Sequence, residues 1–145
     1  MKREEVSVAA GVPIANTEFY HAFESLSIEM MDSLWKHDDD VICIHPGWDL
    51  FIGWLAIRES WTTIFRNTEM IRFIITNMKI RFLDNRSRMA IVVCQENIES
   101  SINGQLVRIG VIATNIFERN ENHWLLVHHH GSSISNYLPS NVSAQ

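Results

Sequence analysis

The pair Asn103-Gly104 lies between two long, largely apolar segments and is the strongest hairpin signal in the sequence. Asn followed by Gly favours the tight two-residue turn in which both residues have positive φ. We therefore expect antiparallel strands at about 88–100 and 105–119. Polar turns at 84–86 and 120–122 bound this hairpin and predict two further strands, at about 70–83 and 123–133. The second half of the chain is thus expected to be an antiparallel sheet built from hairpins.

The first half of the chain has the spacing of amphipathic helices. Phe19, Phe23 and Leu26 fall on one helical face, and Asn16 before them is a suitable N-cap. A second helix is expected after Ser27 and a third at about 54–66, with a short buried strand at 41–45 between them. Residues 1–13 show no sustained apolar period, so we expect a flexible arm there. A flexible polar tail is expected at 135–145.

This order predicts a single α+β domain over residues 14–134, with three N-terminal helices packed on a strongly curved, mainly antiparallel β-sheet. Many strand positions are apolar on both sides of the sheet, since Ile91 and Val93 alternate with Val92 and Cys94. A sheet that is apolar on both faces needs a second cover. We therefore expect a homodimer formed through the outer face of the sheet.

Composition argues against several classes of partner. The net charge is −5, whereas nucleic-acid binding needs clustered Lys and Arg. No apolar run approaches the roughly 20 residues of a membrane helix, and the first residues lack the apolar core of a secretory signal. Cys43 and Cys94 stand far apart in apolar runs, as buried reduced thiols do. We therefore expect a cytoplasmic protein without nucleic-acid or membrane partners, and, since phosphate-loop and dinucleotide motifs are missing, without a cofactor.

Short phrases in these elements suggest a family. They are Phe19-Tyr20, Leu34-Trp35, DDVICIHPG at 39–47, Gly53 followed by IRESW at 57–61, ATNIF at 113–117 and WLLVHHH at 124–130. Together they cover about residues 16–134 and resemble the SnoaL-like group of the nuclear transport factor 2-like superfamily, which is related to ketosteroid isomerase. The resemblance implies a sheet curled around the first helix, a pocket at the open end of the cone and dimerisation through the outer sheet face.

His45 is the first candidate for chemistry. By the resemblance it stands where ketosteroid isomerase keeps the Asp that shuttles a proton, directly before a proline, and imidazole is suited to that task near neutral pH. Tyr20 and Asn115 match the positions of that enzyme's two oxyanion donors, so a hydroxyl and an amide are expected to meet at one point. The structural alternatives are a His45 that fixes the end of its strand and a Tyr20 that only lines the core or the rim.

The run of three histidines gives further candidates. His128 and His130 share one face of a strand, with His129 on the other, and we expect the outer two of the run to bind the ligand. Joined by His45, they would also supply the three nitrogen ligands of a catalytic zinc site. The alternative of a polar strand end with hydrogen-bonded imidazoles is favoured, and no metal is expected.

Three more side chains are expected to bind the ligand. Trp48 follows Gly47 in a loop, where an aromatic ring is able to cover an apolar molecule. Trp54 begins the third helix near the expected pocket mouth. Glu96 shares a strand face with Cys94, and is either a buried carboxylate on the concave face or a charge on the outer face.

These features predict a pocket for a small apolar organic ligand. The first hypothesis is a cofactor-independent isomerase, cyclase or lyase that uses His45 as its proton shuttle. The second is a ligand-binding domain without turnover. The third is a dimerisation or assembly module, in which the sheet face carries the function.

Overall fold

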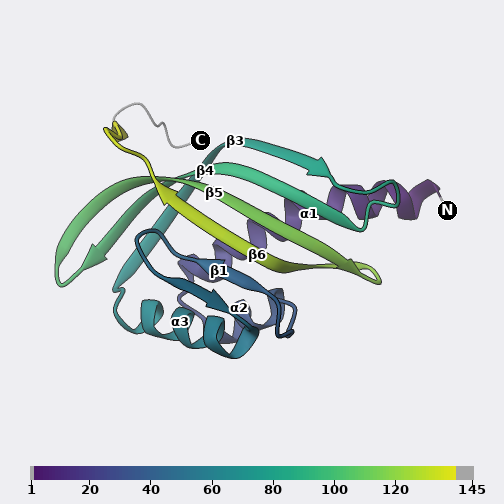
Figure 1. The fold of residues 1–145 in the computed structure, drawn as a ribbon. Helices are drawn as coiled ribbons and strands as arrows, with labels where there is room; N and C mark the ends of the chain where they lie inside the picture. The colour runs from purple at the N-terminus through teal and green to yellow at the C-terminus, as the bar shows by residue number, and fades with distance from the viewer. Residues whose placement is uncertain (1, 140–145) are drawn as a thin grey trace.

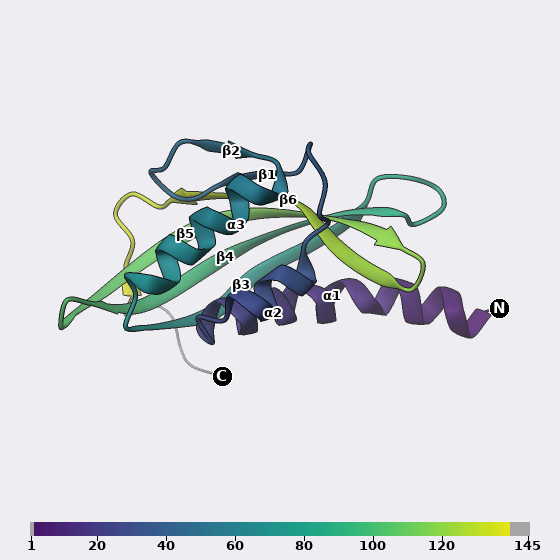
Figure 2. The same ribbon diagram turned by 90° about the horizontal axis from the view of Figure 1, so that it is seen from below.

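The computed structural model describes residues 2–139, and their side chains from residue 11 onward. The elements, in chain order, are α1 (Lys2–Glu24), α2 (Ile28–Leu34), β1 (Ile42–Ile44), β2 (Leu50–Ile52), α3 (Trp54–Arg66), β3 (Met70–Phe82), β4 (Met89–Ile102), β5 (Gln105–Asn120) and β6 (His123–Ser133). The helices lie on one side of the curved sheet, with α1 running along the long strands (Figure 1, Figure 2). The expected α+β class is confirmed.

The six strands of the sheet stand in the order β2-β1-β6-β5-β4-β3. Neighbouring strands are antiparallel except β1 and β6, whose parallel pairing sets Cys43 beside His129. The β4–β5 hairpin turns at Asn103 and Gly104, with φ of 52° and 77°, as the sequence predicts. Strand β2 is not predicted, because its three residues are too few, and all apolar, to show the polar–apolar alternation of a strand.

The first helix begins much earlier than the sequence predicts. Residues 2–13, most of the predicted flexible arm, belong to α1, and Asn16, the predicted N-cap, lies buried inside it. Gly11 and Pro13 are poor helix residues, so local propensity favours a later start. Tertiary packing overrides it: Val12 is fully buried, and a Cβ at Gly11 would lie only 3.1 Å from Cδ1 of Trp124.

Part of the predicted flexible tail is docked on the outer face of the sheet. The Ile134 amide donates to the Gly110 carbonyl at 2.8 Å, and the Tyr137 hydroxyl donates to Asn97 Oδ1 at 2.9 Å. A Cβ at Gly110 would lie 2.3 Å from Cδ1 of Tyr137, so this contact requires glycine. Residues 140–145 of the predicted tail lie outside the described residues.

The core between the helices and the sheet is aromatic. Phe19 and Phe23 of α1 pack edge-on against Trp61 of α3, with ring centroids 5.8 and 4.8 Å apart. Cys43 and Cys94 are buried free thiols, as expected. Over the described part of the chain, none of the helices has the length and apolar character needed to cross a bilayer. The buried polar side chains of the domain gather beside this aromatic cluster.

Candidate functional site

Four polar side chains form a row across the concave face of the sheet. His45 directly follows β1, His129 lies on β6, Asn115 on β5 and Glu96 on β4, in the order in which these strands neighbour one another. None of the four is more than 3% exposed. Because a buried polar group is costly unless it is hydrogen-bonded, the partners of this polar row define what it can do.

Glu96 is held by Tyr20. The Tyr20 hydroxyl, from α1, donates to Glu96 Oε2 at 2.5 Å and lies 3.4 Å from the Cys94 thiol. Burial raises the pKa of the Glu96 carboxyl from 4.5 to about 7, although the bond from Tyr20 acts to lower it. Burial, and then the charge of Glu96, raises the pKa of the Tyr20 hydroxyl well above its ordinary value. The pair therefore holds one carboxyl that changes charge near neutral pH.

Asn115 fixes the middle of the polar row. Its Nδ2 donates to the Tyr20 hydroxyl at 3.2 Å and to Asn16 Oδ1 at 2.9 Å. Its Oδ1 therefore faces Nδ1 of His129 at 2.6 Å, and because an amide oxygen only accepts, Nδ1 carries the proton. Burial, reinforced by the neighbouring histidines, lowers the pKa of His129 well below its ordinary value. Asn115 thus orients both Tyr20 and a neutral imidazole.

His45 lies at the other end of the polar row. Its Nε2 is 2.9 Å from the Ser60 hydroxyl, which already donates to the Ile57 carbonyl at 2.6 Å. Since a hydroxyl has one proton, Nε2 of His45 is the donor in this bond, and the lone pair that can take a proton is on Nδ1. Burial lowers the pKa of His45 to about 4, so the ring is neutral at physiological pH. Trp61 packs edge-on against this ring, with centroids 4.6 Å apart.

A pocket of about 360 Å³ opens between α1 and β3, a volume in the range of small-molecule sites. It is lined by Asn16, Thr17, Tyr20, His21, Glu24, Phe73 and Ile75. Asn16 and Tyr20 are buried, whereas Thr17, His21 and Glu24 are exposed and form the rim. Tyr20 therefore connects the pocket with Glu96, which lies behind it.

A β-bulge in the edge strand shapes this pocket. The register of β3 against β4 shifts between Thr76 and Lys79, and Asn77 has a φ of 54°. The bulge brings the sulfur of Met78 to 3.7 Å from Nδ2 of Asn16. Such insertions re-aim side chains at the edges of sheets.

The predicted site residues do not all meet. Tyr20, Asn115 and Glu96 come together, and Glu96 is on the concave face. His45 does not line the pocket of Tyr20, and Trp48, 42% exposed, lies edge-on to the His45 ring. Trp54 is buried elsewhere and stacks on Trp35 and His37. The structure thus gives no support to Trp54 as a residue of the same site.

The three histidines alternate between the faces of β6 as predicted, but the outer two face away from the polar row. His129 is buried on the concave face, whereas His128 is half-buried and His130 exposed on the opposite one. The cause is a bulge in β6: His128 pairs with Ile116 and Leu126 with Phe117, so Val127 has no partner and the alternation reverses. Since His128 and His130 point away from His45, the three do not form a zinc site.

Asn16 and His129 belong to the site but are not predicted as site residues. Asn16 comes shortly after Pro13 and directly precedes an apolar helical pattern, which is the typical place of a cap. Its true role depends on contacts with Asn115 and Met78, far away in the sequence. His129 is placed on the concave face by its parallel pairing with the buried Cys43, which also joins segments far apart in the sequence.

Comparisons with known proteins identify the family and agree with the fold described above. A family model described as a SnoaL-like domain matches residues 12–136. A candidate dehydratase of the NTF2-like family from Streptomyces avermitilis is 34% identical, with a TM-score of 0.77 over 85% of this chain and 94% of that one. A candidate calcium/calmodulin-dependent protein kinase type II association domain from Thiobacillus denitrificans is 28% identical, with a TM-score of 0.70 over 83% and 93% of the two chains.

One curated protein also matches. F-box protein SKIP8 of Arabidopsis thaliana is 28% identical over 130 residues, which are 90% of this chain and 52% of that protein. The chain therefore spans about half the length of this relative. The similarity concerns the domain and not the whole of that protein.

Proposed function

We propose, from the premise that this chain belongs to the SnoaL-like domain family, that it transfers protons on a small organic molecule as an isomerase or lyase. The observation that carries this proposal is the contact of Tyr20 with Glu96 behind a pocket of about 360 Å³. A carboxyl with a pKa of about 7 takes and gives a proton at neutral pH with similar ease. A buried titratable group with a shifted pKa that is reached from a pocket is also a candidate for a functional role.

The protonation state of Glu96 decides what Tyr20 offers to a ligand. When Glu96 is ionised, Tyr20 donates to it, and the phenol oxygen is free to take a proton from the ligand as its own proton moves to Glu96. When Glu96 is protonated, it donates to the phenol oxygen, and the Tyr20 hydroxyl donates its own proton to the ligand. One hydroxyl thus relays a proton in either direction, and the Asn16 amide beside it is a second polar contact for the ligand.

The 34% identical relative, a candidate dehydratase, points to the same kind of chemistry. In a dehydration, Tyr20 would take the proton from the carbon next to a carbonyl and pass its own to Glu96. The bond from the neighbouring carbon to its hydroxyl group then breaks. The proton on Glu96 returns through Tyr20 to the departing oxygen, which leaves as water. Asn115 is a positioning residue in this scheme, since it holds the Tyr20 hydroxyl at 3.2 Å.

The role of His45 as proton shuttle stays a prediction. Its unprotonated Nδ1 has the chemistry of a base, but the ring packs against Trp61 and Ser60 rather than beside Tyr20. A base at this position would act on a ligand that reaches past the rings around it. Loss of proton exchange in His45→Asn, with ligand binding intact, would support that role over the one given to Glu96.

Binding is tested first, with small cyclic ketones as probes in saturation-transfer difference NMR. Thr17 is on the rim of the pocket, so Thr17→Trp is expected to abolish the signals. Leu55→Trp is the matched control, because Leu55 is 83% exposed on α3 and away from this pocket. Ketones that bind Thr17→Trp unchanged would place the site elsewhere.

Turnover is tested next with the ketones that bind. In D2O, proton transfer replaces the hydrogens next to the carbonyl with deuterium, which removes their proton NMR signals. Glu96→Gln and Tyr20→Phe are each expected to slow this exchange at least about 100-fold, the usual contribution of a general acid–base group. Binding without exchange in the wild-type protein would favour the alternative of a ligand-binding domain without turnover.

The outer face of the sheet favours a second function, self-association. Four apolar side chains lie on this face and are partly exposed: Ile91, Val93, Ile112 and Ile116. The 28% identical relative is a candidate association domain, which agrees with an assembly role. Sedimentation velocity is expected to show a homodimer that Ile112→Lys dissociates and Leu55→Lys does not. A wild-type monomer at every concentration tested would refute this function.

A further inference from the structure

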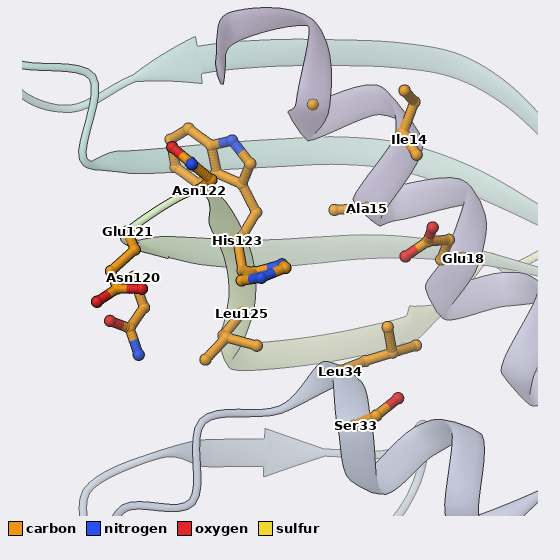
Figure 3. A pocket seen from close by; sticks show the side chains of 12 residues that line it. Ile14, Ala15, Glu18, Ser33, Leu34, Asn120, Glu121, Asn122, His123 and Leu125 are labelled. Atoms are coloured by element: carbon orange, nitrogen blue, oxygen red, sulfur yellow. The ribbon is translucent and has the colours of Figure 1, made fainter. Parts of the chain in front are cut away.

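A second and larger pocket lies on the other side of α1. Its volume is about 650 Å³, and its walls come from the middle of α1, the end of α2 and the β5–β6 hairpin. Figure 3 shows Ile14, Ala15 and Glu18 along α1, facing His123 and Leu125 of β6. The two pockets share no lining residue, so α1 separates them. This second pocket plays no part in the function proposed above.

Close packing at one end holds the pocket in shape. Gly11 allows the Trp124 indole to lie against the backbone of α1, which joins the helix to β6. The adjoining hairpin turns at Glu121, whose φ is 57°. Trp124 is 7% exposed, so this wall of the pocket is fixed rather than loose.

The lining has apolar and acidic parts. Ile14 is 60% exposed, and with Leu34 and Leu125 it gives the pocket an apolar wall. Among the residues whose side chains the structure describes, the charged members of the lining are Glu18 and Glu121, with no Lys or Arg. An anionic ligand would therefore meet only repulsion here, whereas a cation with an apolar body suits both parts of the lining.

Two polar side chains face each other across the pocket. The carboxylate of Glu18 and the imidazole of His123 point toward one another in Figure 3. Within the part of the chain that the structure describes, neither forms a hydrogen bond or an ion pair. A carboxylate accepts hydrogen bonds only, and a neutral imidazole has one nitrogen that accepts. Together they suit a group with several N–H donors.

We propose that this pocket is a second binding site, which takes a small organic amine. The ammonium group donates to Glu18 and to a ring nitrogen of His123, and Glu121 adds to the negative potential. The apolar body of the amine lies against Ile14 and Leu34. The requirement for positive charge separates this site from the first pocket, where a carbonyl compound is expected.

Phenethylamine is a suitable probe, with phenethyl alcohol as a neutral molecule of nearly the same shape. Two-dimensional amide NMR spectra of the full chain are recorded during titration with each. The amine is expected to shift the amide signals of Ala15, Ser33 and His123 but not those of Thr17 and His21, which line the other pocket. The alcohol is expected to bind roughly two- to fivefold more weakly, as the loss of one partly exposed ion pair implies.

Two variants test whether the charge of Glu18 contributes to amine binding. Glu18→Gln is expected to weaken phenethylamine binding about fivefold and to leave the weak binding of the alcohol unchanged. Glu29→Gln is the control, because Glu29 is an exposed acid of α2 outside the pocket. Equal affinity for the amine and the alcohol, equal effects of the two variants, or shifts centred on Thr17 would each overturn the proposal. None of these outcomes depends on proton exchange at Tyr20 and Glu96.

Discussion

Replacement of Glu96 by Gln removes a buried group whose ionisation opposes folding. The carboxyl is 2% exposed, and burial raises its pKa from 4.5 to about 7. A tenfold change in a dissociation constant corresponds to about 1.4 kcal/mol, so the ionised form is about 3 kcal/mol less favourable in the folded protein than in the unfolded chain. Gln has nearly the same shape and its oxygen still accepts from Tyr20, but it has no proton to lose.

The direction of the pH dependence follows from proton binding. Between pH 4.5 and about 7 the folded state holds the Glu96 proton while the unfolded chain has released it. Stability falls with rising pH wherever the folded state binds more protons. The wild-type protein therefore loses about 3 kcal/mol from this group as the pH rises through that window. This loss of stability is absent below the window and complete above it. Glu96→Gln has no carboxyl to titrate and does not show the loss.

Urea unfolding at several pH values measures this difference. The free energy of unfolding of Glu96→Gln minus that of the wild-type protein is expected to rise by about 3 kcal/mol between about pH 4 and pH 8. Other titrating groups contribute equally to both proteins and cancel. Glu99→Gln is the control, since Glu99 lies on the outer face of the same strand and pairs with Arg108 at 3.0 Å.

Parallel stability curves for Glu96→Gln and the wild-type protein would refute this reasoning. They would mean that Glu96 is either ionised at little cost or reached by solvent. In that case the carboxyl would lack the pKa on which the proposed proton transfer depends. A carboxyl carbon NMR signal of Glu96 that titrates near pH 4.5, its ordinary value, would lead to the same conclusion.

Two further changes test the buried contacts. Burial lowers the pKa of His45 from 6.5 to about 4. The free energy of unfolding of the wild-type protein is therefore expected to fall by about 3 kcal/mol as the pH falls through that window. In urea unfolding, His45→Gln is expected to lose less. Gly110→Ala is expected to cost about 1–3 kcal/mol of stability, because its Cβ would displace the Tyr137 ring. In a Tyr137→Ala background the same substitution is expected to be nearly neutral, and an equal cost in both backgrounds would show that the ring is not the cause.

Local signals in the sequence predict much of the fold. The Asn103-Gly104 turn depends on two residues that both accept positive φ, and both have it. Ser27 is a correct N-cap, since its hydroxyl accepts from the Met30 amide at 3.2 Å. The third helix has the predicted range of 54–66. In each case the deciding interactions lie within a few residues of one another.

The candidate site is predicted only in part, because bulges and tertiary contacts set it. Trp124 and Leu126 are buried, so regular alternation along β6 would place His128 on the concave face. The bulge at the unpaired Val127 shifts the alternation by one residue and places His129 there instead. Local sequence predicts a helix cap at Asn16, and only its contact with Asn115 reveals its role in the site. Neither the position of a bulge nor a contact between the ends of a chain has a local sequence signal.

The parallel pairing of β1 with β6 also determines when the site can form. Cys43 and His129 meet in this pairing, so the end of β1 that positions His45 has its neighbour only after nearly the whole chain has been made. Pairings between residues distant in sequence are slow to form. During synthesis the helices emerge first, and the part of their apolar surface that packs on β6 stays uncovered until that strand arrives. We therefore expect a nascent chain that ends before β6 to bind chaperones, although it already contains every helix of the described fold.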